Sequence, residues 1–77
     1  MPGIELFGTV GCPYTAEVRE HLDWNGVIFT EYDVEADAAA RARLRELTGG
    51  RNAVPVLVEG GRVIQIGWQG RSCMVGP

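Results

Sequence analysis

The chain has 77 residues, of which 45% are hydrophobic and 22% charged, and its formal net charge is −3. This length is enough for one domain, 1–77, but too short for two separate cores. All the basic residues are arginines and the acids outnumber them, so the chain lacks the basic excess that nucleic-acid binding requires. It shows neither a secretory signal nor an apolar run approaching the roughly 18 residues of a membrane span. We therefore expect a cytoplasmic globular protein that binds neither nucleic acid nor membrane.

The first predicted elements are a buried strand over 4–8, a sharp turn, and a helix over 13–25. The strand is an apolar run closed by a glycine. Pro13 suits the first position of a helix, where its missing N–H costs nothing, and Asn25-Gly26 is a typical stop. Acids are expected in the first turns, as the helix dipole favours: Glu17 and Glu20. The apolar face is predicted to contain Tyr14, Val18 and Leu22, with His21 beside it on the helix face.

A second strand, a second helix and a hairpin are predicted after the first helix. The run 27–34 is typical of a strand with one face partly in contact with water. Over 35–48, acids precede arginines as a helix dipole favours, and two glycines end the segment. Two apolar runs, 54–58 and 62–66, flank a glycine turn and predict the hairpin. The apolar stripe of the second helix would be formed by Ala40, Leu44 and Leu47.

This element order predicts a small α/β protein with a four-stranded mixed sheet. The first crossover should be right-handed, which makes the first two strands parallel. In a sheet of this order the last strand is antiparallel to the third and parallel to the first. The first and last strands therefore end at the same edge of the sheet.

The turn GCPYT places Cys12 at the start of the first helix. Unpaired backbone N–H groups and the positive end of the helix dipole stabilise a thiolate over a thiol at such a position. Cysteines in these settings have pKa values of about 3.5 to 7.5, against about 8.5 for a free cysteine. Cys12 is therefore a candidate nucleophile, and the alternative is a buried, inert side chain.

The stretch CPYT between a strand and a helix, followed by AVPVLV before a hairpin, resembles the glutaredoxins. The resemblance covers nearly the whole chain and implies a thioredoxin-like fold, βαβαββ, with the final helix missing or vestigial. It implies that Cys12 is the nucleophile and that Thr15 occupies the place of the second thiol in the usual motif. Val54-Pro55 is similar to the cis-proline segment of this fold, which packs beside the thiol and offers backbone to a bound disulfide. The expected substrate-binding residues are Pro13, Tyr14, Thr15, Val54, Pro55 and Trp68.

The segment after the last predicted strand differs from that of most glutaredoxins. The lysine before the cysteine and the Gly-Gly-acidic segment, both used on glutathione in the family, are replaced by Thr9 and by 67–70. Together with EYDVE and VPV, the terminal IGWQGRSC resembles the small UXX-star group, whose members carry cysteine or selenocysteine in the Pro-Tyr-Thr turn. That resemblance implies that residue 12 can be selenocysteine in the natural gene or in related proteins. Trp68 is expected either to line the substrate groove or to cover the apolar face left bare by the missing helix.

Cys73 lies in a tail, 70–77, beyond the last predicted strand. The cysteine follows that strand by about seven residues, a reach of up to roughly 23 Å at about 3.3 Å per residue. This reach allows the tail to return to the Cys12 turn. A disulfide between the two cysteines would close a loop of about 60 residues and contribute about 4 kcal/mol of stabilisation. The alternative is a free thiol on a frayed terminus.

Three functions are compatible with these residues. In the first, Cys12 attacks a protein or small-molecule disulfide and Cys73 resolves the mixed disulfide, with thioredoxin reductase or glutathione as the electron donor and no required cofactor. In the second, the protein is a monothiol reductase in which glutathione resolves and Cys73 is idle. In the third, it is a binding module that bridges an iron–sulfur cluster or holds a partner without turnover. A zinc site is not expected, because zinc normally has four ligands and the sequence shows no Cys/His cluster.

Overall fold

The computed structural model describes residues 3–75, so residues 1–2 and 76–77 of the predicted domain and tail lie outside the described part. The main sheet has strand order β2-β1-β4-β5 and is formed by β1 (Ile4–Gly8), β2 (Phe29–Asp33), β4 (Val56–Glu59) and β5 (Arg62–Ile66). β1 and β2 run parallel, whereas β4 is antiparallel to both of its neighbours. β5 is therefore parallel to β1, and the two strands end at the same edge, as the sequence predicts.

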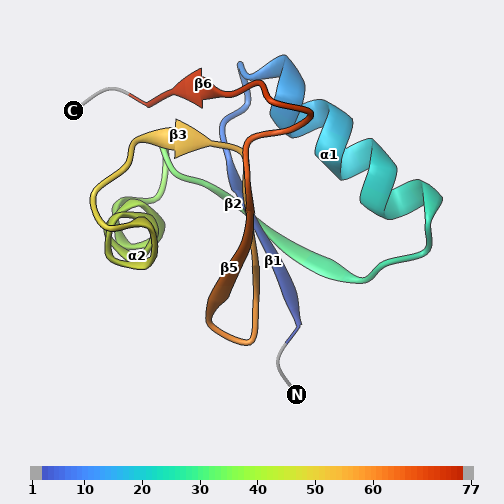
Figure 1. Ribbon diagram of the computed structural model, residues 1–77, viewed down its shortest axis with the longest axis horizontal. Helices are drawn as coiled ribbons and strands as arrows, with labels where there is room; N and C mark the ends of the chain where they lie inside the picture. The colour runs from blue at the N-terminus through green and yellow to red at the C-terminus, as the bar shows by residue number, and fades with distance from the viewer. Residues whose placement is uncertain (1–2, 76–77) are drawn as a thin grey trace.

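Two helices, α1 (Pro13–Trp24) and α2 (Ala38–Thr48), cover opposite faces of the sheet (Figure 1). Successive side chains of a strand point to opposite faces. Leu6 therefore packs with the α1 residues Val18 and Leu22, whereas Phe7 packs with the α2 residue Leu44. In the described residues, no helix is both long and apolar enough to cross a membrane.

The second strand and the second helix are shorter than predicted. β2 begins at Phe29, and the preceding Ile28 is 92% exposed. α2 begins after Asp37, whose carboxylate accepts a hydrogen bond from the Ala40 N–H at 3.1 Å. Because this cap sets the start of the helix, Glu35 lies in the turn before it.

The prediction of acids in the first helical turns was wrong for α1. The first turns of α1 and α2 contain no acidic residue. α1 begins at Pro13, so Glu17 lies one turn into the helix and Glu20 farther along. At α2 the acids precede the arginines, as predicted, because Asp37 is the N-cap residue and Glu35 lies just before it.

The predicted strand 54–58 is divided at Pro55. The Val54–Pro55 peptide bond is cis, and the two residues before the proline form β3 (Ala53–Val54), which is not part of the main sheet. β3 pairs with β6 (Cys73–Met74) to form a second, two-stranded sheet at the end of the molecule where α1 begins (Figure 1). In the described chain, the segment after β5 therefore ends in a short strand and forms no helix.

Candidate functional site

Cys12 is the N-cap residue of α1. Its backbone is extended, with φ −92° and ψ 115°, and its carbonyl accepts a hydrogen bond from the Ala16 N–H at 3.3 Å. Pro13 occupies the start of the helix, as predicted. The Cys12 side chain is only 2% exposed and caps no backbone amide of α1. The backbone N–H groups in the first turn of α1 are therefore not capped by the side chain of their N-cap residue, Cys12.

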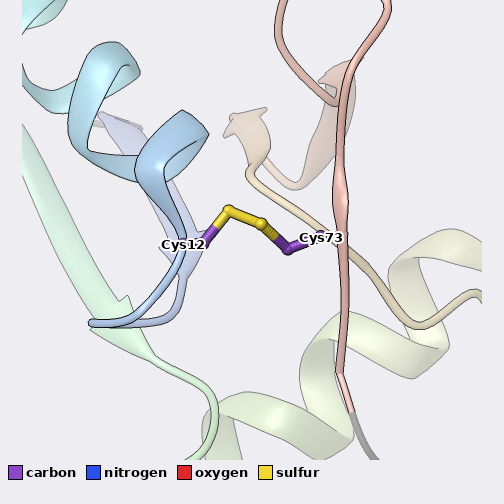
Figure 2. Close-up of a disulfide and its surroundings, with 2 residues drawn as sticks. All are labelled: Cys12 and Cys73. Atoms are coloured by element: carbon purple, nitrogen blue, oxygen red, sulfur yellow. A yellow bond between two sulfur atoms is a disulfide. The ribbon is translucent and has the colours of Figure 1, made fainter.

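Cys12 forms a disulfide with Cys73, 61 residues later in the chain. The two Cα atoms are 6.0 Å apart, and the bond joins the start of α1 to β6 (Figure 2). The tail therefore returns to the Cys12 turn, as the topology predicts. The alternative of a free Cys73 thiol on a frayed end was wrong, because neither cysteine is free.

Backbone pairing and a buried anchor hold β6 in place. β6 runs antiparallel to β3, with Cys73 opposite Val54. Val75 is 5% exposed within the main core, and its N–H donates to the Asn52 carbonyl at 2.7 Å. Met74, between Cys73 and Val75, is 77% exposed. Val75 was not predicted from the sequence, although an apolar residue two positions after Cys73 in an extended segment was an available signal.

The loop between β5 and β6 directs the chain back towards Cys12. The Gly67 N–H donates to the Pro55 carbonyl at 2.7 Å, which ties the start of the loop to the cis-proline segment. Trp68 and Arg71 then exchange backbone hydrogen bonds at 2.7 and 2.9 Å. This tight turn reverses the chain before it enters β6.

Val54 lies opposite Cys73 in the β3–β6 pair, and Pro55 follows it after a cis peptide bond. Both are fully buried, and Val54 shares the main core with Cys12. The edge of β3 that the resemblance assigns to a bound disulfide is paired here with β6 of the same chain. The protein's own tail therefore occupies this edge when the disulfide is formed.

Thr15 is fully buried and packs against the end of β1. A Cβ atom on Gly8 would lie 2.2 Å from Thr15 Cγ2, so only glycine fits at that position. The Thr15 hydroxyl is buried and has no hydrogen-bond partner within residues 3–75. The sequence analysis placed Tyr14 on the buried face of the helix, but Thr15 takes this place and Tyr14 is half-buried against the main core.

Trp68 covers part of the apolar face on the α1 side of the sheet. It packs against the core cluster that contains Leu6 and Leu22, and its ring centroid lies 5.0 Å from that of the exposed His21. The structure thus shows the covering contact expected for Trp68. Arg71 is exposed, and its guanidinium lies 6.0 Å from the centroid of the Tyr14 ring.

A charge pair joins α2 to β1. Arg43 donates two hydrogen bonds to the Glu5 carboxylate, at 2.7 and 2.9 Å. These bonds lower the pKa of Glu5 below its ordinary value, against the effect of desolvation, and a hydrogen bond from Tyr32 adds to the lowering. Within the described range, no three His, Cys, Asp or Glu side chains are grouped so that they could hold a metal ion.

The fold and the site define a thioredoxin-like protein with a disulfide at the start of its first helix. A solved variant of the thioredoxin-like protein BC3987 superposes with a TM-score of 0.78 and 38% identity, over 90% of this chain and 86% of that one. A buckwheat glutaredoxin solved with glutathione superposes with a TM-score of 0.69 and 25% identity, over 84% of this chain and 61% of that one.

The family model for glutaredoxin matches residues 4–64. A probable glutaredoxin of Synechocystis sp. is 33% identical over 52 residues, which cover 68% of this chain and 48% of that protein. The chain belongs to the glutaredoxin family. It spans about half the length of the curated relative that it matches.

Proposed function

We propose that this protein, taken as a single domain over 1–77, is a thiol-disulfide oxidoreductase that uses Cys12 as nucleophile and Cys73 as resolving thiol. The observation that carries the proposal is the disulfide between the N-cap of α1 and β6. Once reduced, the Cys12 sulfur lies at the positive end of α1, where a thiolate is stabilised at neutral pH. The thiolate is the nucleophile in disulfide exchange.

The reaction consists of two exchanges. In the first, the Cys12 thiolate attacks a substrate disulfide, a bond forms between Cys12 and one substrate sulfur, and the other substrate sulfur leaves as a thiolate that takes up a proton. In the second, the Cys73 thiolate attacks Cys12, the Cys12–Cys73 disulfide forms, and the second substrate thiol leaves. The substrate disulfide gains two electrons, and the two protein thiols lose them.

The residues around the bond have supporting roles in this proposal. Pro13 starts the helix, Thr15 fills the place of a second motif thiol, and Val54-Pro55 forms the wall beside the sulfur. Tyr14, which packs against the same core cluster as Cys12, and Trp68 are the other residues that we assign to substrate binding. A protein or small-molecule disulfide would contact these residues while it is bonded to Cys12.

The oxidised protein must regain two electrons from an external donor. The buckwheat glutaredoxin binds glutathione, which supports glutathione as a reductant here, and thioredoxin reductase is the alternative donor. We place the activity in the cytoplasm, where such reductants keep thiols reduced. The motifs of the UXX-star group support membership of that group, and in this chain the reactive atom is the sulfur of Cys12.

Turnover of a small disulfide such as hydroxyethyl disulfide by the single-cysteine variants tests the proposal. We expect Cys12→Ser to abolish turnover, because no other thiol lies at a helix start. Cys73→Ser should still complete the first exchange and accumulate a mixed disulfide on Cys12 that mass spectrometry detects, whereas the neighbouring Ser72→Ala should behave like the parent. Full glutathione-dependent turnover by Cys73→Ser would instead support the monothiol reductase.

A further inference from the structure

We propose that a groove between α1 and the loop after β5 binds an arginine side chain of the disulfide substrate. Peptides and proteins with an arginine a few residues from the reacting cysteine are then the preferred substrates. The inference rests on the proposed function and names the substrate class of that site. The groove has a volume of about 410 Å³, which lies within the usual range of ligand sites. It is lined by Glu17, Glu20, His21, Trp24, Trp68 and Gln69, and its two walls can be followed in Figure 1.

Two tryptophans form the aromatic part of the groove. Trp24 is 91% exposed, although an indole ring is among the largest apolar surfaces that folding can bury. Trp68 packs against the core cluster that contains Leu22, and its ring centroid lies 5.0 Å from that of His21, so these contacts hold it in place. A guanidinium group binds the face of a tryptophan ring through cation–π and stacking interactions. The groove therefore offers aromatic surface that suits an arginine side chain.

Two carboxylates give the groove the charge that a cation requires. Glu17 and Glu20 are both exposed, and neither takes part in the ion pairs formed within residues 3–75. Arg19, which lies between them in the sequence, instead donates two hydrogen bonds to Glu31. A guanidinium group pairs with a carboxylate in a bidentate geometry that an ammonium group cannot reproduce. The combination of carboxylates and indole rings therefore favours arginine over lysine.

The distance from Cys12 sets where the arginine would lie in the substrate. Glu17 and Glu20 follow Cys12 by five and eight residues, which is about 7.5 and 12 Å along α1 at about 1.5 Å per residue. An extended peptide covers these distances in roughly two to four residues at about 3.3 Å per residue. A substrate that extends along α1 from Cys12 therefore places an arginine at this spacing in the groove. Binding there raises kcat/KM for the first exchange.

Two peptides that differ in a single side chain test this preference. Each carries one cysteine as a mixed disulfide with 2-nitro-5-thiobenzoate and has either arginine or its neutral isostere citrulline roughly three residues away. Separate pairs place this side chain before and after the cysteine. Attack by the Cys12 thiolate forms a bond between Cys12 and the peptide sulfur, and the coloured thiobenzoate leaves with the electron pair of the broken bond. Its absorbance gives the second-order rate constant, which the rate with 2-mercaptoethanol corrects for the intrinsic reactivity of each peptide.

We expect the arginine peptide to react about five to twenty times faster than the citrulline peptide at pH 8 and low ionic strength. The ratio should fall towards one as added salt screens the carboxylates. A ratio of one at low ionic strength in both pairs of peptides would overturn the proposal.

A pair of double variants separates the groove from the overall charge of the protein. Glu17→Gln with Glu20→Gln removes both carboxylates of the groove and should lower the ratio at least about threefold. Glu35→Gln with Glu46→Gln changes the net charge by the same amount at exposed acids outside the groove, and should leave the ratio as in the parent. Equal ratios in the two double variants would contradict the proposal.

Tryptophan fluorescence separates this inference from the proposed function. Both tryptophans of the chain line the groove, so their emission reports on its occupancy. Peptides with serine in place of cysteine, titrated into the oxidised protein, should bind with a Kd about five to twenty times lower for arginine than for citrulline. That preference in a protein that exchanges no disulfide would refute the proposed function and support the groove. Disulfide exchange without any preference would refute the groove alone.

Discussion

Loss of the Cys12–Cys73 disulfide should remove about 4 kcal/mol from the free energy of unfolding. The cysteines are 61 residues apart. Closing a loop of about 60 residues lowers the entropy of the unfolded chain by roughly 14 cal/mol/K, which is about 4 kcal/mol at 25 °C. In a domain of this size, such a loss corresponds to a fall in Tm of roughly 15 to 35 °C. The effect is large because the hydrophobic core of so short a chain is small.

Urea denaturation of the oxidised parent, the reduced parent and Cys73→Ser measures this difference. Tryptophan fluorescence and far-ultraviolet circular dichroism should follow one transition, and the midpoint should fall in the two forms that lack the bond. Adding reductant to Cys73→Ser is the matched control and should change nothing. A difference of less than about 1 kcal/mol between oxidised and reduced parent would refute the loop-closure argument.

Three further perturbations follow from contacts outside the disulfide, and the same denaturation assay measures each. Gly8→Ala should lower the free energy of unfolding by about 1 to 3 kcal/mol through overpacking against Thr15; the double change with Thr15→Ala should recover part of the loss, and purely additive losses would argue against the contact. Val75→Asp should cost about 2 to 4 kcal/mol because it buries a charge, whereas Met74→Asp should stay within about 0.5 kcal/mol. Glu5→Gln should cost about 1 kcal/mol or less at pH 7, because the side chain of its partner Arg43 is 45% exposed. The folded-state pKa of Glu5 lies below its ordinary value of 4.5, so this contribution is present above that value and is lost as the pH falls through the lowered pKa. A Glu5→Gln effect that stays constant down to pH 2, or one that the exposed Glu46→Gln reproduces, would contradict this assignment.

The sequence predicted the bounds of an element correctly where a glycine or a proline marks its end. The strand over 4–8 and the start of α1 at Pro13 agree with prediction, because a glycine and a proline fix their ends. The strand over 62–66 also agrees, since a pair of glycines precedes it. The apolar residues Val27 and Ile28 suggested an earlier start for the second strand. Exposure of Ile28 depends on tertiary structure that hydrophobicity alone does not report.

The site was predictable to the extent that it follows from topology. Parallel first and last strands bring the tail to the same edge as Cys12, which is why its pairing with Cys73 could be anticipated. The pairing of β6 with β3 depends on Pro55, which separates Val54 from the rest of a run that the sequence predicts as one strand, 54–58. Thr15 can be buried because Gly8 has no side chain. This contact joins a helix residue to a strand residue seven positions earlier, so the periodicity of the helix alone does not predict it.

The disulfide also divides the oxidised chain into a covalent ring and two short arms. The ring contains both helices and the strands from β2 to β5, whereas β1 lies in one arm. A molecule stretched between its two ends would bear the load through the sulfur–sulfur bond, so the ring would not extend. Roughly 20 nm of contour length, at about 3.3 Å per residue, would stay hidden until a reductant cut the bond. Unfoldases and pores that thread polypeptides would therefore encounter the oxidised form as a closed loop and the reduced form as a single strand.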